Sequence, residues 1–150
     1  MHIVADETRC SGCRACELAC VARHDGRFGA ATARIRVLKI EARGIDRPQV
    51  CRVCVEAPCV GACPVGALSR DPATSAVRLR AAECIVCPAC SDACPFGVVF
   101  VDAATGMPLI CDLCEGDPAC VKRCVTGALS WAEQAAPPRK APCVSGTDHV

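Results

Sequence analysis

The sequence has almost no aromatic residues. Among 150 residues there are one Trp, three Phe and no Tyr. The large side chains that normally fill a protein core are therefore missing, and much of the apolar content is Ala and Val, which have little bulk. The chain is long enough for one domain or for two small modules. We infer that something other than side chains occupies part of the interior.

Signals of several other protein classes are also missing. The start of the chain has no basic segment followed by an apolar run and no twin-arginine signal, and no apolar stretch is long enough to span a membrane. The formal net charge of +1 provides no basic field for nucleic acid. There is no P-loop, no Gly-x-Gly-x-x-Gly and no Cys-x-x-Cys-His, which removes support for nucleotide, flavin or c-type haem binding. We therefore expect a cytoplasmic protein that binds no nucleic acid and has no membrane span.

What the chain has in excess is cysteine. Of its 17 cysteines, all but Cys143 fall into four groups. The groups are Cys10-x2-Cys13-x2-Cys16-x3-Cys20, Cys51-x2-Cys54-x4-Cys59-x3-Cys63, Cys84-x2-Cys87-x2-Cys90-x3-Cys94 and Cys111-x2-Cys114-x5-Cys120-x3-Cys124. Thiols stay reduced in the cytoplasm, so this many cysteines in a short chain indicates metal binding rather than disulfides.

The four groups form an internal repeat, which organises the rest of the chain. Short helices are expected to begin near the third cysteine of each group, at Cys16, Cys59, Cys90 and Cys120. Strands are expected at residues 2–6, 34–37 and 77–80, and strand-like apolar pieces follow the last three groups at 65–68, 96–100 and 126–129.

The spacing favours iron–sulfur clusters. An x2 step lets a tight loop point successive thiolates at one object, and three of them can hold three iron corners of a cubane. A fourth cysteine after an x3 step points away, and in bacterial two-cluster ferredoxins it ligates the other cluster. Four groups supply sixteen ligands, enough for four [4Fe–4S] clusters. Structural zinc is a poorer fit because it uses two separated Cys-x2-Cys pairs.

The groups, in this order and spacing, resemble the four-cluster ferredoxin subunits of the dimethyl sulfoxide reductase iron–sulfur family, over roughly residues 1–131. The resemblance implies an α+β fold of two nested ferredoxin-like modules, with short antiparallel strands and short helices around four Fe–S clusters. Residues 1–24 and 99–131 would form the outer module with groups one and four. Residues 51–98 would form the inner module with groups two and three, residues 25–50 an insertion, and residues 132–150 an extended or disordered tail.

The same resemblance implies four ligand sets. The first set is Cys10, Cys13, Cys16 and Cys124; the second is Cys20, Cys111, Cys114 and Cys120; the third is Cys51, Cys54, Cys59 and Cys94; the fourth is Cys63, Cys84, Cys87 and Cys90. Cys143 is expected to be a free thiol and not a ligand, and no residue is expected to be catalytic. Val21 and Val125 stand where the family usually has proline, which leaves the number of ligands unchanged.

Segments 13–20, 33–37 and 111–118 look most like the small electron-transfer subunit of tungsten-dependent aldehyde oxidoreductases. That implies a non-catalytic subunit that relays electrons one at a time through four [4Fe–4S] clusters. It would connect a catalytic subunit, with tungsten or molybdenum favoured, to a flavin subunit or soluble carrier, and copies of the chain could stack end to end. The alternatives are a free polyferredoxin that serves several enzymes, or an electron-transfer subunit of a hydrogenase, formate dehydrogenase or carbon monoxide dehydrogenase. His24 could tune a nearby cluster, but the expectation is an exposed histidine at a helix end.

Overall fold

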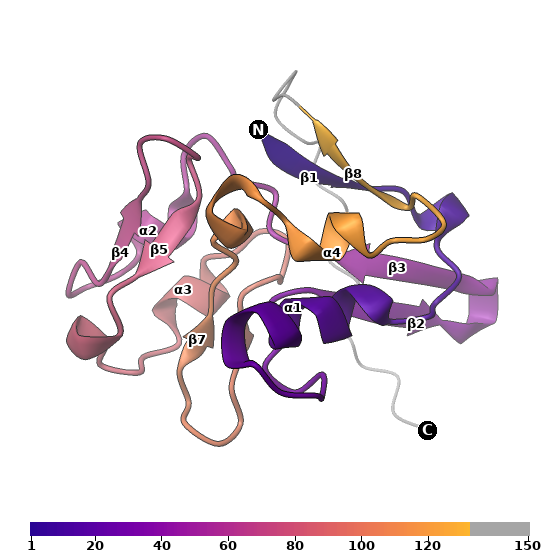
Figure 1. The fold of residues 1–150 in the computed structure, drawn as a ribbon. Coiled ribbons are helices and arrows are strands. Elements are labelled where there is room, and N and C mark those ends of the chain that lie inside the picture. The colour runs from indigo at the N-terminus through magenta and orange to yellow at the C-terminus, as the bar shows by residue number, and fades with distance from the viewer. Residues whose placement is uncertain (133–150) are drawn as a thin grey trace.

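The computed structural model describes residues 1–132 (Figure 1). Its strands form four separate two-stranded antiparallel sheets. The strands are β1 (His2–Ala5), β2 (Arg36–Ile40), β3 (Ile45–Gln49), β4 (Leu68–Arg70), β5 (Val77–Leu79), β6 (Phe100–Val101), β7 (Pro108–Leu109) and β8 (Leu129–Ala132). The helices are α1 (Ala15–Asp25), α2 (Pro58–Gly61), α3 (Ala89–Asp92) and α4 (Ala119–Lys122), with 3-10 turns η1 (Glu7–Arg9), η2 (Glu41–Arg43), η3 (Ala81–Glu83) and η4 (Leu113–Gly116).

This is the α+β fold that the sequence predicts, and each helix begins next to the third cysteine of a group. None of the helices among residues 1–132 is both long and apolar enough to cross a membrane. The tail from residue 133 onward and Cys143 lie outside the described residues. Ala132, which the sequence assigns to the tail, is the last residue of β8.

The first and last strands of the described chain pair with each other. In the antiparallel β1–β8 sheet Ile3 lies opposite Trp131, and the N–H of Asp6 donates to the carbonyl of Ala128 at 2.8 Å. Groups one and four, which follow β1 and precede β8, are therefore neighbours in space although about a hundred residues separate them (Figure 1).

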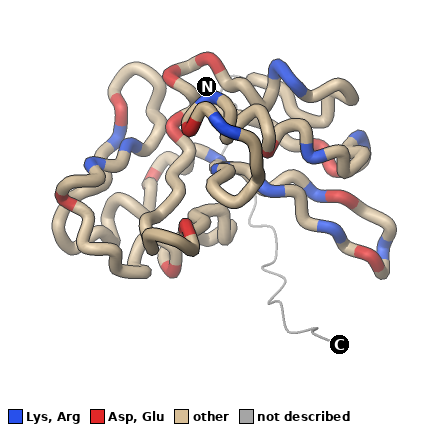
Figure 2. Tube along the Cα trace, turned by 60° about the horizontal axis from the view of Figure 1, so that its bottom comes forward, with Lys and Arg blue, Asp and Glu red and all other residues tan. Residues whose placement is uncertain are grey.

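The predicted insertion forms a projecting hairpin of β2 and β3, on which basic and acidic residues alternate (Figure 2). Its base is fixed to α1 by Glu17, which is only 2 % exposed. The Glu17 carboxylate accepts the N–H of Val37 at 2.7 Å. The strand expected at 34–37 begins later, at Arg36, because the N–H of Arg34 donates to a cysteine sulfur instead of to a strand.

The apolar pieces after the cysteine groups are turns rather than strands. Gly66, Gly97 and Gly127 have φ angles of 63°, 60° and 65°, a left-handed conformation that glycine adopts without strain. The sequence prediction of strands over 65–68, 96–100 and 126–129 was therefore wrong for most of these residues. The strands β4, β6 and β8 begin only at the last residue of each piece.

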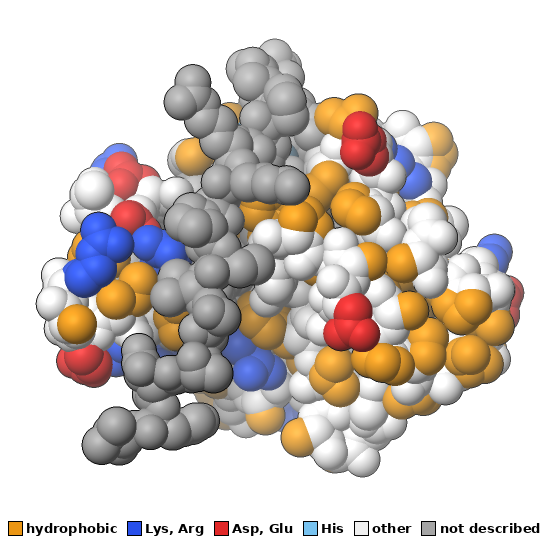
Figure 3. Space-filling view, turned by 180° about the vertical axis from the view of Figure 1, so that it is seen from behind, with side chains coloured by type: hydrophobic (Ala, Val, Ile, Leu, Met, Phe, Trp, Pro, Cys, Tyr) orange, Lys and Arg blue, Asp and Glu red, His pale blue; other side chains and the backbone are white. Residues whose placement is uncertain are grey.

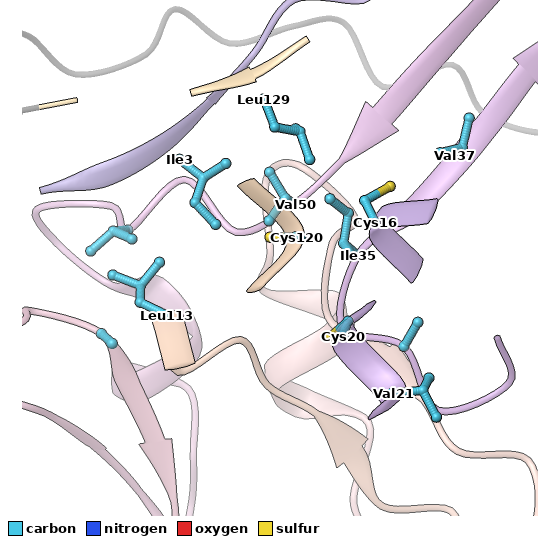
Figure 4. Packing of buried hydrophobic residues seen from close by; sticks show 13 residues of the cluster. Ile3, Cys16, Cys20, Val21, Ile35, Val37, Val50, Leu113, Cys120 and Leu129 are labelled. Atoms are coloured by element: carbon cyan, nitrogen blue, oxygen red, sulfur yellow. The ribbon is translucent and has the colours of Figure 1, made fainter. Parts of the chain in front are cut away.

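The two halves of the molecule have unequal hydrophobic cores. The larger core lies between α1, α4, the β1–β8 sheet and the hairpin (Figure 4), and its most deeply buried large side chains are Ile3, Ile35, Val50, Val53 and Leu113. Cysteines 16, 20 and 120 are part of this core. The smaller core lies around α2, α3 and the β4–β5 sheet and consists of Ala57, Leu68, Val77, Cys90 and Ile110.

Candidate metal centres

All four cysteine groups begin with the same backbone turn. The second residue after the first cysteine has a positive φ in each group, at Gly12 (67°), Val53 (51°), Val86 (57°) and Leu113 (57°). This conformation lets the N–H of Val53 donate to Sγ of Cys51 at 3.5 Å. The N–H of Val86 donates to Sγ of Cys84 at 3.4 Å. A left-handed conformation at a β-branched residue is strained, and strain of this kind concentrates at functional loops.

A second repeated turn follows the last cysteine of three groups. The N–H of Gly66 donates to the carbonyl of Cys63 at 3.3 Å, and Gly97 and Gly127 make the same bond after their own cysteines. The turn also directs backbone N–H groups at sulfur. Burial opposes a low pKa at Cys63, yet four N–H groups from Val65 to Leu68 together bring that pKa below its ordinary value.

The cysteines of the second predicted set surround one cavity. The cavity is lined by Cys20, Cys111, Cys114 and Cys120, together with His24, Arg34 and the apolar side chains of Ile3, Ile35, Val50, Leu113 and Pro118. The cysteines come from α1, from the loop around η4 and from α4. Residues nearly a hundred positions apart in the sequence therefore meet at one small space.

The third and fourth predicted sets each line a cavity in the other half of the molecule. The third cavity is lined by Cys51, Cys54, Cys59 and Cys94, by Cys111, and by Arg52, Ala57, Pro58, Val77, Pro95, Phe96, Val98, Val99 and Ile110. The fourth is lined by Cys63, Cys84, Cys87 and Cys90, and by Val65, Ala67, Leu68, Leu79, Ile85 and Pro108. Helices α2 and α3 each contain one cysteine, and a cysteine of the other set lies two residues beyond the end of each helix.

The residues of the first predicted set lie where α1 approaches the end of α4. Cys16 is buried, Cys10 and Cys124 are half-buried and Cys13 is exposed. Burial raises the pKa of Cys16 to about 12, and the charges of Glu17 and Cys10 contribute in the same direction. Cys124 accepts the N–H of Leu129 at 3.4 Å.

Most of the buried thiols resist ionisation when no cation is near. Burial raises the pKa of Cys51 to about 11 and that of Cys120 to about 12. The pKa of Cys111 lies well above its ordinary value for the same reason. Such thiols are protonated near neutral pH, and they become thiolates when a bound metal compensates the negative charge.

His24 occupies a different environment from the one the sequence predicts. Its side chain is 14 % exposed, and its Nε2 lies 3.7 Å from Sγ of Cys114. The prediction of an exposed helix-end histidine was therefore wrong. The sequence does carry a signal: His24 is four residues after Cys20, and residues at this spacing share one face of a helix.

The donor sets fit iron–sulfur clusters. Within residues 1–132, neither Asp nor Glu lines any of the three cysteine-lined cavities. Sites made only of thiolates select soft metals and Fe–S clusters. Backbone N–H groups aimed at sulfur, as at Cys51, Cys63 and Cys84, are the groups that tune cluster potentials.

Each cysteine group is a repeated turn followed by a helix, and three of the predicted ligand sets line cavities. These features define an iron–sulfur protein with a ferredoxin-like fold. The chain belongs to the 4Fe–4S dicluster domain family, whose model matches residues 44–134. The match covers groups two, three and four.

Curated proteins with similar sequences are named as subunits of oxidoreductases or as electron transport proteins. The chain is 44% identical over 122 residues to the aliphatic sulfonate oxidoreductase, polyferredoxin-like subunit, of Pyrococcus furiosus, covering 81% of this chain and 70% of that protein. It is 37% identical over 150 aligned positions to the electron transport protein HydN of Escherichia coli strain K12, covering 85% of each. Among solved structures it resembles a chain of the active site complex BamBC of benzoyl coenzyme A reductase, with a TM-score of 0.54 and 30% identity over 91% of this chain and 81% of that chain.

Proposed function

We propose that this chain is an electron-transfer iron–sulfur subunit that binds four [4Fe–4S] clusters through sixteen of its seventeen cysteines. The ligands are Cys10, Cys13, Cys16 and Cys124 for the first cluster; Cys20, Cys111, Cys114 and Cys120 for the second; Cys51, Cys54, Cys59 and Cys94 for the third; and Cys63, Cys84, Cys87 and Cys90 for the fourth. In the described residues three of these sets each line a separate cavity, which supports the grouping.

The main evidence for an electron relay between the sites is the position of Cys111. This residue lines the cavity of the second set and also that of the third, so the two sites share a wall. The pKa of Cys120 in the second set is raised by burial, by two thiols of its own set and by Cys16 of the first. The third and fourth sets adjoin through α2 and α3. On this grouping, we propose that the four sites follow one another in the order first, second, third and fourth.

Within this proposal the chain supplies binding and environment rather than bond-making chemistry. When bound, [4Fe–4S] clusters would supply one-electron redox chemistry. The cysteines hold them, backbone N–H groups at positions such as Val53 and Val86 donate to sulfur, and the apolar cavity walls exclude water. We accordingly assign the chain as a non-catalytic carrier.

The partner we favour is the catalytic subunit of an oxidoreductase that contains tungsten or molybdenum, with a flavin subunit or soluble carrier at the other end, in the cytoplasm. Similarity to a subunit of an aliphatic sulfonate oxidoreductase supports a fixed place in a complex.

The surface of the molecule also supports a fixed place in a complex. Val65 and Ile85 line the fourth cavity, yet their side chains are 41 % and 59 % exposed. Viewed from behind, hydrophobic side chains gather on that half of the molecule, opposite the hairpin (Figure 3). An apolar, weakly charged surface is typical of permanent interfaces.

The alternatives are a free polyferredoxin that serves several enzymes, or an electron-transfer subunit of a hydrogenase, a formate dehydrogenase or a carbon monoxide dehydrogenase. Similarity to HydN, named an electron transport protein, favours the free polyferredoxin among these alternatives. An anaerobic pull-down of the tagged chain from its native host separates a fixed subunit from a free carrier, with iron, tungsten and molybdenum measured in the same eluate.

A large subunit that co-elutes in stoichiometric amount with tungsten or molybdenum is the expected result. An iron-loaded chain that elutes alone would favour the free carrier, and zinc without iron would contradict cluster binding altogether.

A further inference from the structure

Three polar side chains meet at the edge of the second cavity. They are His24 at the end of α1, Arg34 in the loop before β2, and Asp112 beside η4. Nη1 of Arg34 lies 3.3 Å from Oδ2 of Asp112, and Nε2 of His24 lies 3.5 Å from Oδ1 of the same carboxylate. Arg34 and Asp112 are 25 % and 24 % exposed, so these contacts are partly shielded from water.

This group contacts two of the four cysteines of the second set. The backbone N–H of Arg34 donates to Sγ of Cys20 at 3.3 Å. Nε2 of His24 lies 3.7 Å from Sγ of Cys114, within the range for hydrogen bonds to sulfur. Both contacts place a nitrogen against a thiol that would carry negative charge as an iron ligand.

The guanidinium of Arg34 contacts both ring nitrogens of His24. A guanidinium has only donors, and its Nη1 lies closer to Nδ1 (2.5 Å) than to Nε2 (2.9 Å). The shorter contact favours Nδ1 as the acceptor from Arg34, which leaves the hydrogen of a neutral imidazole on Nε2. The acceptors near Nε2 are then Oδ1 of Asp112 at 3.5 Å and Sγ of Cys114 at 3.7 Å.

A separate metal ion bound by His24, Asp112 and Cys114 is a poor interpretation of the same residues. Their ligand atoms lie within 4.8 Å of one another. However, the guanidinium of Arg34 contacts both His24 and Asp112 and would repel a cation there. Cys114 also belongs to the set around the second cavity.

We propose that Arg34 and His24 act together as positioning residues for the second cluster. Arg34 donates its backbone N–H to Cys20 and holds His24 in the tautomer that donates from Nε2 to Cys114. Two additional N–H···S hydrogen bonds stabilise the more negative, reduced state, so they give this cluster a higher reduction potential than it has without them. The inference rests on the proposed ligand set.

The test uses the intact, anaerobically purified holoprotein labelled with ¹⁵N-histidine. Iron content, the midpoint potentials of all clusters, and pulsed EPR of the reduced protein are measured. In the wild type we expect a ¹⁵N coupling from one histidine to one cluster. His24→Leu removes the donor, so the coupling is lost and a single midpoint potential shifts downward. The matched control, His2→Leu on β1, leaves the coupling and all potentials unchanged.

Variants of Arg34 test the tautomer. Every replacement here keeps the backbone N–H to Cys20. Arg34→Met has no side-chain donor, so it weakens the ¹⁵N coupling and lowers the same potential, whereas Arg34→Lys retains both because its ammonium still donates to Nδ1. If His24→Leu does not take up iron, His24→Gln provides the test: its amide donor keeps the potential near the wild-type value while the ¹⁵N-histidine coupling disappears.

A wild-type protein with fewer than four clusters would contradict the proposed function itself. Full iron content with no histidine coupling, or with unchanged potentials in His24→Leu, would contradict this inference alone. An equal shift of all potentials in His24→Leu would also contradict it, because that indicates a general loss of structure.

Discussion

Val86 donates its backbone N–H to Sγ of Cys84 at 3.4 Å while holding a φ angle of 57°. A β-branched residue in this conformation carries roughly 1–2 kcal/mol of strain, and the bond to sulfur requires it. Val53 and Leu113 hold the same position in their groups, and Gly12 holds it without strain. The strained conformation therefore recurs in the cysteine loops. In the loops of Val53 and Val86 it points the N–H of the strained residue at the sulfur of the first cysteine.

Substitutions at Val86 separate the strain from the hydrogen bond. The side chain is 44 % exposed, so Val86→Gly removes the strain, loses little packing and keeps the N–H. We expect it to bind all four clusters. Val86→Pro fixes φ near −65° and removes the N–H, so we expect the fourth cluster to be lost and the iron content to fall to about twelve per chain.

The control for this pair is Ala81→Pro. It places proline at the first position of η3, after Arg80 in an extended conformation, which proline tolerates. Iron analysis with electronic absorption spectra distinguishes the three variants. Full iron content in Val86→Pro would show that the N–H···S bond is not needed.

Two glycines with nearly equal φ angles should respond differently to alanine. Gly66 (63°) has open space where a Cβ would lie, whereas a Cβ on Gly12 (67°) would collide with the carboxylate of Asp46. We expect Gly66→Ala to cost about 1 kcal/mol, from backbone strain alone, and Gly12→Ala to cost somewhat more because the carboxylate of Asp46 must also move away. The midpoint of guanidinium bleaching of the holoprotein measures both, and equal midpoints would contradict the steric account.

Removal of iron should affect the two halves unequally. The half that contains β1, β8 and the hairpin has a core with Ile3, Ile35 and Leu113, whereas the half around α2 and α3 has a small one. Clusters replace much of the missing core, so their loss unfolds the smaller half first. Hydrogen exchange after anaerobic chelation should show early loss of protection in β4 and β5. Simultaneous exchange in β1 and β8 would contradict this order.

The metal-free protein should lose stability as the pH rises. Burial raises the pKa of Cys16 and of Cys120 to about 12, against 9.0 for a free thiol. Because the folded pKa is the higher one, each thiol contributes stability below pH 9 that is lost as the pH rises toward 12. The free energy of unfolding should fall by roughly 2 kcal/mol per thiol between pH 9 and 11.

Urea unfolding followed by the fluorescence of Trp131 in β8, the single Trp of the chain, provides the measurement. Cys16→Ala should reduce the pH dependence. A stability that rises over this interval would contradict the assignment of buried, protonated thiols.

The sequence was most informative where spacing alone determines structure. The x2 and x3 steps correctly predicted loops followed by helices at Cys16, Cys59, Cys90 and Cys120, because the constraint lies within a few residues. The apolar pieces after the cysteines were wrongly predicted as strands. Gly66, Gly97 and Gly127 form tight turns there, but the apolar residues around them are typical of strands.

The environment of His24 depends on long-range packing. His24 meets Asp112 only because β1 pairs with β8 and returns group four to α1. Arg34 reaches the same place because the hairpin is fixed to α1 through Glu17. A one-dimensional pattern does not indicate which cation lies beside which thiol, and an exposed helix end was the reasonable expectation for this histidine.

Native mass spectrometry of the anaerobically purified chain tests the central claim most directly. We expect one species whose mass exceeds that of the polypeptide by four [4Fe–4S] units, about sixteen irons and sixteen sulfides. Exchange of Cys111 for alanine should remove at least one unit, since Cys111 lies at the wall between two sites. A wild-type species with two clusters, or with zinc in place of iron, would contradict the four-cluster relay.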